Sequence, residues 1–86
     1  MDKRILELRE QIDKLDEDII RLLKIRMKIS KQVGKLKDRL DIPVEDKIRE
    51  SQIIERLTQQ AGKNLSEKQL IRIFTAVFKS SKQIQR

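Results

Sequence analysis

Several polar side chains of this 86-residue chain stand at helix positions where the surrounding pattern predicts apolar residues, and together they could bind a small anion. Arg26 is the clearest case. Along one helix face, apolar residues follow one another at steps of three and four on both sides of it: Ile5, Leu8, Ile12, Leu15, Ile19 and Leu22 before it, and Ile29, Val33, Leu36 and Leu40 after it. A guanidinium among apolar residues costs free energy unless an anion pairs with it. The pattern therefore predicts an anion close to Arg26.

A second cation, Lys37, projects from the same side of this helix. It lies eleven residues after Arg26. That separation is close to three whole turns, so the two side chains point the same way about 17 Å apart along the axis. Two long side chains can converge on one small ligand across that gap. Taken alone, Lys37 is most simply a surface lysine, and Arg26 a register device or half of an interhelical ion pair.

Polar residues also extend the apolar faces of the two shorter helices that the rest of the chain predicts. Ser81 and Gln85 continue the face of the last helix at i+3 and i+4 spacing. In the middle helix, Asp46 and Glu50 lie on the face that carries Ile53. Each has a simple structural explanation, such as a fraying end, a first-turn acid or a surface ion pair. One cationic, hydrogen-bonding pocket explains all of them with a single cause.

The residue types limit the chemistry of such a pocket. Two or more cations suit a polyanion, most simply a dicarboxylate. Glu50 could accept a hydrogen bond from a ligand hydroxyl, while Lys37 and Gln85 could donate to an uncharged ligand oxygen. The chain has no histidine and no cysteine, and no activated nucleophile or metal-binding cluster is recognisable. An enzyme built this way would hold a flexible substrate in a reactive conformation and place cations where charge develops.

The elements that position these residues are predicted to be three helices, which makes the fold class all-α. The first helix should run from Asp2, a suitable N-cap, to about Leu40, and Pro43 stops it. It is then about 57 Å long, whereas a compact domain of this size is about 30 Å across. Because the helix must overhang its own domain with its apolar stripe uncovered, we expect an intertwined homodimer.

Local signals place the two shorter helices within one domain that spans residues 1–86. The middle helix should start near Glu45 or Asp46, where acids suit the positive helix terminus, and should end at Gly62. Its apolar face is predicted to consist of Ile48, Ile53, Ile54, Leu57 and Ala61. Ser66 and Gln69 match a capping box that opens the last helix.

The net charge of +7, with 41% of residues charged, has two interpretations. It could attract nucleic acid or an acidic surface, or it could reflect a lysine-rich surface with a few cations reserved for a small anion. Acids are interspersed among the bases, which favours the second. No apolar run approaches the length of a membrane span and no signal peptide is recognisable. We therefore expect a cytoplasmic protein with no membrane and no nucleic-acid partner.

Three segments carry a resemblance to a known family: LREQIDKLDEDIIRLLKIRMKISKQVGKLK, IPVEDKIRESQIIERL and LIRIFTAVFKSSKQIQ. Over nearly its full length the chain resembles the all-α class of chorismate mutases, close to the bacterial and archaeal single-domain members. The resemblance implies an isomerase that rearranges chorismate to prephenate, the step toward phenylalanine and tyrosine. It also implies a helix-swapped homodimer with two active sites and no cofactor.

The resemblance also implies roles for individual residues. Arg26 looks like the arginine that binds a substrate carboxylate, and Ser81 looks like a further carboxylate contact. Lys37 and Gln85 look like the pair that hydrogen-bonds the ether oxygen, where negative charge grows as the carbon–oxygen bond breaks. Glu50 looks like the acceptor for the ring hydroxyl.

Three further positions match the family pattern. The backbone at Asp46 looks like a second contact to the hydroxyl, and Arg49 like a supporting cation at the rim. Arg9 looks like the arginine supplied by the other subunit. On a straight helix Arg9 is about 25 Å from Arg26, so it cannot share a small site with Arg26 of its own chain, whereas an antiparallel partner could bring it there.

Gln85 departs from the family pattern in its surroundings, because the sequence ends one residue after it. Helix ends fray, so we expect its contact to the ether oxygen to be the weakest in the pocket.

Three other functions compete with this interpretation. An isochorismate-pyruvate lyase has a similar fold and a similar pocket. A basic helical module could bind nucleic acid, although the chain lacks aromatic stacking residues and a concentrated basic patch. A pure dimerisation bundle would keep Arg26 without any ligand.

Overall fold

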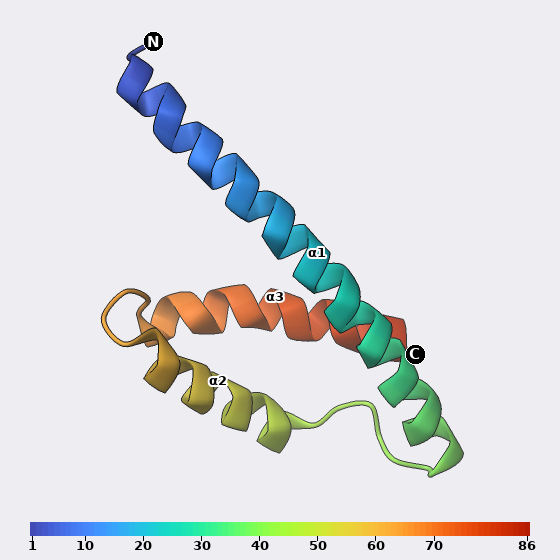
Figure 1. Cartoon of the computed structure of the whole chain (residues 1–86). Coiled ribbons are helices and arrows are strands. Elements are labelled where there is room, and N and C mark those ends of the chain that lie inside the picture. Colours follow the sequence, from blue (N-terminus) through green and yellow to red (C-terminus); the bar gives the residue numbers. More distant parts are fainter.

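In a computed structural model that describes all of residues 1–86, the chain consists of three α-helices and no strands. They are α1 (Lys3–Arg39), α2 (Lys47–Ala61) and α3 (Glu67–Gln85). The predicted all-α class and the three predicted helices are confirmed. Figure 1 shows α1 as a single rod much longer than the other two.

Residues at the helix ends explain where each helix begins and stops. The Asp2 side chain accepts a hydrogen bond from the Arg4 amide at 2.8 Å and caps α1. Ser66 and Gln69 form the predicted capping box at the start of α3. Gly62 follows α2 with φ of +60°, a backbone conformation that glycine adopts without a steric penalty. The boundaries therefore agree with the local sequence signals.

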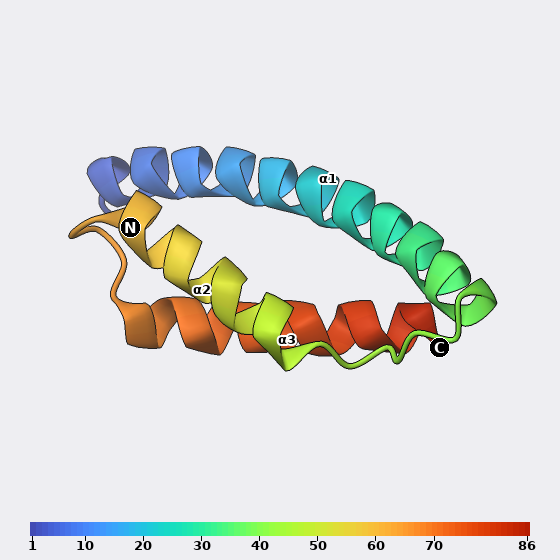
Figure 2. The ribbon, with the colours of Figure 1, turned by 90° about the horizontal axis from the view of Figure 1, so that it is seen from below.

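The helix α3 holds the other two helices together. Both α1 and α2 pack against α3, whereas α1 and α2 do not pack against each other. Figures 1 and 2 show α2 and α3 running antiparallel, with the second half of α1 lying along the end of α3. The buried residues lie where these contacts occur: Ser30, Gly34, Ile53, Leu70, Phe78 and Ser81. The core is thin, since no side chain is fully enclosed.

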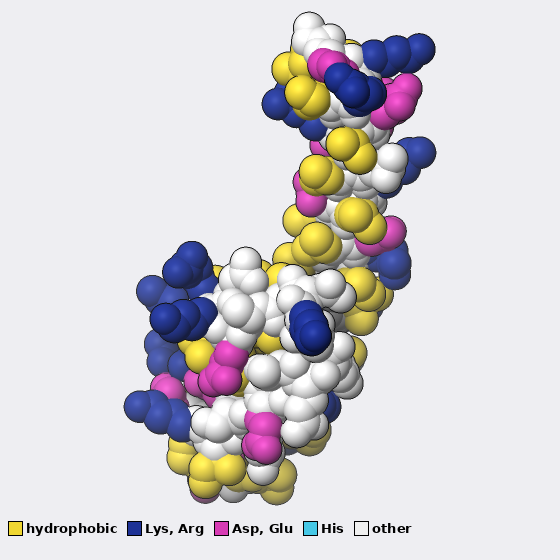
Figure 3. Space-filling view, turned by 90° about the vertical axis from the view of Figure 1, so that its left-hand side faces the viewer, with side chains coloured by type: hydrophobic (Ala, Val, Ile, Leu, Met, Phe, Trp, Pro, Cys, Tyr) yellow, Lys and Arg dark blue, Asp and Glu magenta, His cyan; other side chains and the backbone are white.

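The first half of α1 projects beyond the rest of the molecule, as the sequence predicts. The chain measures 56 Å along its longest axis and 24 Å and 16 Å along the others. Figure 3 shows apolar side chains gathered along this projecting arm. They are between 45% and 59% exposed and comprise Ile5, Leu8, Ile12, Leu15, Ile19 and Leu22. None of the three helices is both long and apolar enough to cross a membrane.

One prediction about α2 is wrong. Ile48, which the periodicity placed on the apolar face, is 75% exposed. It lies in the first turn of α2, where Glu50 makes the contact with Lys82 of α3, and the first buried apolar residue of α2 is Ile53. The helix period alone does not show where along its length a helix meets its neighbour.

Gly34 sets how closely α3 approaches α1. A Cβ atom added at this buried glycine would lie 2.6 Å from the Cα of Gln85 and 2.8 Å from its carbonyl oxygen. Real Cβ atoms do not approach backbone this closely, so only glycine allows the last turn of α3 to sit here. Gln85 is therefore packed against α1 at a helical position, which differs from the expectation of a frayed end.

We predict that Gly34→Ala lowers the free energy of unfolding by about 1–3 kcal/mol, because the added methyl group meets backbone that cannot move away without shifting α3. Intrinsic helix propensity acts in the opposite direction and favours alanine by about 1 kcal/mol. Chemical denaturation at fixed protein concentration measures the difference, with Lys35→Ala at the exposed neighbouring position as the control. A Gly34→Ala protein more stable than the parent would show that the close approach does not exist.

Candidate functional site

A pocket of about 480 Å³ lies where the second half of α1, the start of α2 and the end of α3 come together. Because α1 and α2 do not pack against each other, the space between them is open, and residues of α3 form its third wall. Its walls combine apolar and charged side chains: Arg26, Ile29, Ser30, Val33, Lys37, Val44, Asp46, Arg49, Glu50, Ile53, Phe78, Ser81, Lys82 and Gln85.

Seven of the eight residues that the sequence singles out line this one pocket. They come from all three helices and from the segment before α2: Arg26, Lys37, Asp46, Arg49, Glu50, Ser81 and Gln85. Helical spacing explains why Arg26 and Lys37 share one side of α1 and why Ser81 and Gln85 share one side of α3. Asp46 is instead placed by its position as the N-cap of α2. The structure brings these residues together, and their contacts with a ligand are argued below.

Arg9 is the exception. It lies on the projecting half of α1 and does not line the pocket. Its side chain is exposed and donates to the sulfur of Met1 at 3.0 Å. Within one chain, therefore, Arg9 and Arg26 do not share a site.

Arg26 is partly buried and forms no salt bridge. Its Nη1 donates a hydrogen bond to the Ser81 hydroxyl, and its guanidinium lies 5.9 Å from the centre of the Phe78 ring. Burial lowers the pKa of Arg26, and the positive charge of Arg49 lowers it further. Both effects oppose the charged form, and a negatively charged ligand would reverse the second. The surroundings of Arg26 therefore disfavour its positive charge, and a bound anion would favour it.

Two more polar groups have incomplete or replaceable partners. The Nζ of Lys37 donates to the Val44 carbonyl oxygen at 3.0 Å. The Oε1 of Gln85 is buried and accepts no hydrogen bond. A buried polar atom without a partner costs about 1–3 kcal/mol, so a ligand group that donates a hydrogen bond to this oxygen would remove a penalty. Both groups border the same pocket.

The two acids at the α2 end of the pocket, Asp46 and Glu50, already have partners within the chain. Asp46 caps α2, where its Oδ1 accepts from the Arg49 amide at 2.9 Å. Glu50 lies 3.3 Å from Lys82 through its Oε2, and the same ammonium lies 3.3 Å from the Oε1 of Glu45. Asp46 therefore has a structural role in its side chain, while Glu50 retains a second carboxylate oxygen for another donor.

The sequence analysis missed Lys82. It lies four residues after Phe78 and three before Gln85, so the spacing rule that selected Ser81 and Gln85 also applies to it. Including Lys82, four basic and two acidic side chains line the pocket. The surplus of two positive charges suits a ligand with two carboxylates.

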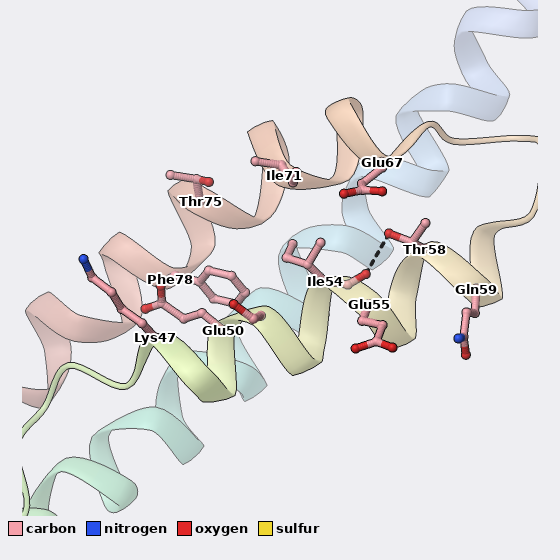
Figure 4. A pocket seen from close by; sticks show the side chains of 11 residues that line it. Lys47, Glu50, Ile54, Glu55, Thr58, Gln59, Glu67, Ile71, Thr75 and Phe78 are labelled. Carbon is pink, nitrogen blue, oxygen red and sulfur yellow. Dashed lines mark hydrogen bonds between the residues drawn. The ribbon is translucent and has the colours of Figure 1, made fainter.

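A second hollow of about 570 Å³ lies between α2 and α3 (Figure 4). It shares Glu50 and Phe78 with the pocket, but its charged residues are mainly acids: Lys47, Glu50, Glu55 and Glu67. The Thr58 hydroxyl there donates to the Ile54 carbonyl, so it is already satisfied within α2. This acidic surface would repel a dicarboxylate, so it is a poorer candidate than the first pocket.

Comparisons with known proteins agree with the resemblance in sequence. Residues 8–86 match the family model described as chorismate mutase type II. Among solved structures, the chain is similar to a conserved hypothetical protein from Pyrococcus furiosus, with 34% sequence identity over the whole of both chains and a TM-score of 0.82. No curated protein matches the chain. Since the family model spans almost all of the residues, this chain belongs to the chorismate mutase type II family.

Proposed function

We propose that this protein is a chorismate mutase, an isomerase that converts chorismate to prephenate on the route to phenylalanine and tyrosine. One observation carries the proposal: a partly buried arginine without a salt bridge borders a pocket with two surplus positive charges. Chorismate has two carboxylates, a ring hydroxyl and an ether oxygen. These groups match the cations, the carboxylate and the uncharged donors that line the pocket.

The reaction is unimolecular and of the Claisen type. A carbon–oxygen bond of the ether breaks while a carbon–carbon bond forms within the same molecule, so no proton or electron has to be supplied. The protein would act by holding chorismate in the folded conformation and by stabilising the negative charge that develops on the ether oxygen. This chemistry fits a pocket that has cations and amides but no activated nucleophile.

In the proposed complex, Arg26 and Ser81 bind one substrate carboxylate. Lys37 and Gln85 donate to the ether oxygen, and the Lys37 ammonium has donors to spare because only one of its three contacts the Val44 carbonyl. Glu50 accepts from the ring hydroxyl with the carboxylate oxygen that does not face Lys82. In each case the group has spare bonding capacity or a partner that a ligand can replace.

Two rim residues complete the proposed binding site. Arg49 is exposed beside the pocket and adds positive charge without a direct bond to another side chain. The backbone at Asp46 would contact the hydroxyl, since its side chain is occupied in capping α2.

We also propose that the active protein is a helix-swapped homodimer. The projecting half of α1 exposes six large apolar residues along one face, and an antiparallel copy of the same helix would cover them. In that arrangement, the Arg9 of each chain reaches the pocket of the other, where a second carboxylate of chorismate needs a cation. Arg9 is free to do so because its side chain is exposed.

The first test follows the loss of chorismate by absorbance with the purified protein. We predict that the parent forms prephenate and that Arg26→Leu lowers kcat/KM by at least about 100-fold, the effect expected for removing a charge-stabilising donor. Arg21→Leu removes an exposed arginine from the same helix and should leave the rate unchanged.

Other outcomes would refute the proposal in distinguishable ways. Release of salicylate and pyruvate from isochorismate, without conversion of chorismate, would identify a lyase. A folded, dimeric parent that is inactive on both substrates, together with an Arg26→Leu variant of higher stability, would favour a dimerisation bundle. Salt-sensitive DNA binding without either activity would favour the nucleic-acid module.

A mixing experiment tests the shared site. Arg9→Ala and Arg26→Ala should each be nearly inactive alone. After the two are unfolded and refolded together, each mixed dimer contains one site with both arginines, so about a quarter of all sites should regain activity. Sedimentation verifies that dimers form. If activity does not return in mixed dimers, Arg9 does not act across the interface.

A further inference from the structure

One wall of the pocket is made by a short stretch of backbone instead of a helix. Residues 44–46, called here the 44–46 segment, lead from the end of α1 into α2, and Val44 and Asp46 both line the pocket. Since α1 and α2 do not pack against each other, this segment closes the gap between them. Its position therefore decides whether the pocket is closed on that side.

Two lysines hold the 44–46 segment from opposite sides. Lys37 of α1 donates to the Val44 carbonyl at 3.0 Å. Lys82 of α3 contacts the Glu45 carboxylate at 3.3 Å and, with the same ammonium, the Glu50 carboxylate at 3.3 Å. Lys82 thus joins the segment, the first turn of α2 and the last turn of α3 at one point.

These two tethers behave differently when substrate binds, an argument that rests on the function proposed above. The Lys37 ammonium has three donors, so it would share them between the Val44 carbonyl and the ether oxygen of the substrate. The ion pair between Lys82 and Glu45 is the side-chain tether of the segment whose ammonium makes no proposed bond to the substrate. The same ammonium also offsets two carboxylates that would otherwise repel an incoming dianion.

We propose that Lys82 is a positioning residue for this reaction: it holds the 44–46 segment closed over bound substrate and orients the Glu50 carboxylate toward the substrate hydroxyl. Its side chain is 23% exposed and its partners are 47% and 26% exposed, so the three-group cluster is partly shielded from water. The hydrogen bond to Glu45 raises the pKa of Lys82, partial burial opposes this, and the bond to Glu50 raises it again. Lys82 is therefore cationic at neutral pH.

The first arm of the test uses the whole protein without substrate, so it does not depend on the proposed activity. The Arg49 amide donates to the Asp46 side chain and the Glu50 amide to the Asp46 carbonyl, so both report on the segment. Hydrogen exchange at these amides should be faster in Lys82→Met and in Glu45→Gln by about 2–10-fold, the range for losing one intramolecular hydrogen bond.

Two comparisons make this arm specific. Lys79→Met removes a lysine of the same charge from an exposed position on α3 and should exchange as the parent does. The double variant Lys82→Met/Glu45→Gln should exchange no faster than Lys82→Met, because both changes remove the same tether. If the two substitutions have additive effects on the exchange rates, or if Lys82→Met exchanges at the parental rate, Lys82 and Glu45 do not tether the segment.

The second arm measures kinetics on chorismate. Lys82→Met should lower kcat/KM by about 10–100-fold, with a raised KM from the unpaired carboxylates and a lowered kcat from a misplaced Glu50. Lys82→Arg keeps the cation and should restore most of the rate, whereas Lys79→Met should match the parent. Glu45→Gln should lose less than Lys82→Met, since Glu50 keeps its partner.

The outcomes separate this proposal from the function on which it rests. If the parent converts chorismate but Lys82→Met matches Lys79→Met, or if Lys82→Arg is as impaired as Lys82→Met, Lys82 has no positioning role. If the parent converts no chorismate, the proposed function fails, and the exchange arm still decides whether Lys82 holds the segment.

Discussion

The positive charge of Arg26 is the constraint on which the rest of the structure depends. Its guanidinium is partly buried beside Phe78, bonds to a neutral hydroxyl and has no carboxylate partner. Burial and the nearby Arg49 both disfavour the charge. A folded chain retains such a group only when other contacts compensate for it, and here α3 provides them by packing against both other helices. The pocket lies where α1 and α2 pack separately against α3, and this cation lines it.

Packing at a few positions controls the shape of the pocket. Gly34 lets the end of α3 lie against α1, which carries Gln85 to the pocket edge. The capped start of α2 presents Glu50, and the 44–46 segment spans the gap between α1 and α2. Apolar contacts are sparse in one chain, where no side chain is fully enclosed. A second copy over the exposed stripe of α1 would add the apolar burial that small domains need.

Much of the fold follows from local sequence signals, and the reasons are physical. Caps at Asp2 and Ser66 and the stop at Gly62 depend on neighbouring residues only, so the helix boundaries were predictable. Polar residues within apolar stripes also identified most of the groups that share the pocket, because helical spacing fixes which side of a helix they occupy. Arg49 was named only through the family resemblance. The exposure of Ile48 was not predictable in this way, since it depends on where α2 meets α3.

Features that depend on tertiary distances escaped the sequence analysis. The spacing of Lys82 marks it as a pocket residue, but its partners Glu45 and Glu50 lie more than thirty residues earlier in the chain and were identified only from the structure. The packing of Gln85 against Gly34 joins residues that are far apart in sequence, and it replaced the expected fraying. The proposed role of Arg9 requires a second chain, whose position one chain's structure does not give.

The most direct test of the central claim is the free energy of unfolding with and without prephenate, a dicarboxylate that the proposed enzyme produces and does not consume. The parent is compared with Arg26→Met/Ser81→Ala, which removes the cation together with its hydroxyl partner, at one fixed protein concentration. Prephenate at 100 times its dissociation constant should stabilise the parent by about 2.7 kcal/mol. It should leave the variant unchanged, and the variant alone should be at least as stable as the parent. If prephenate stabilises both proteins equally, Arg26 and Ser81 do not bind the dicarboxylate.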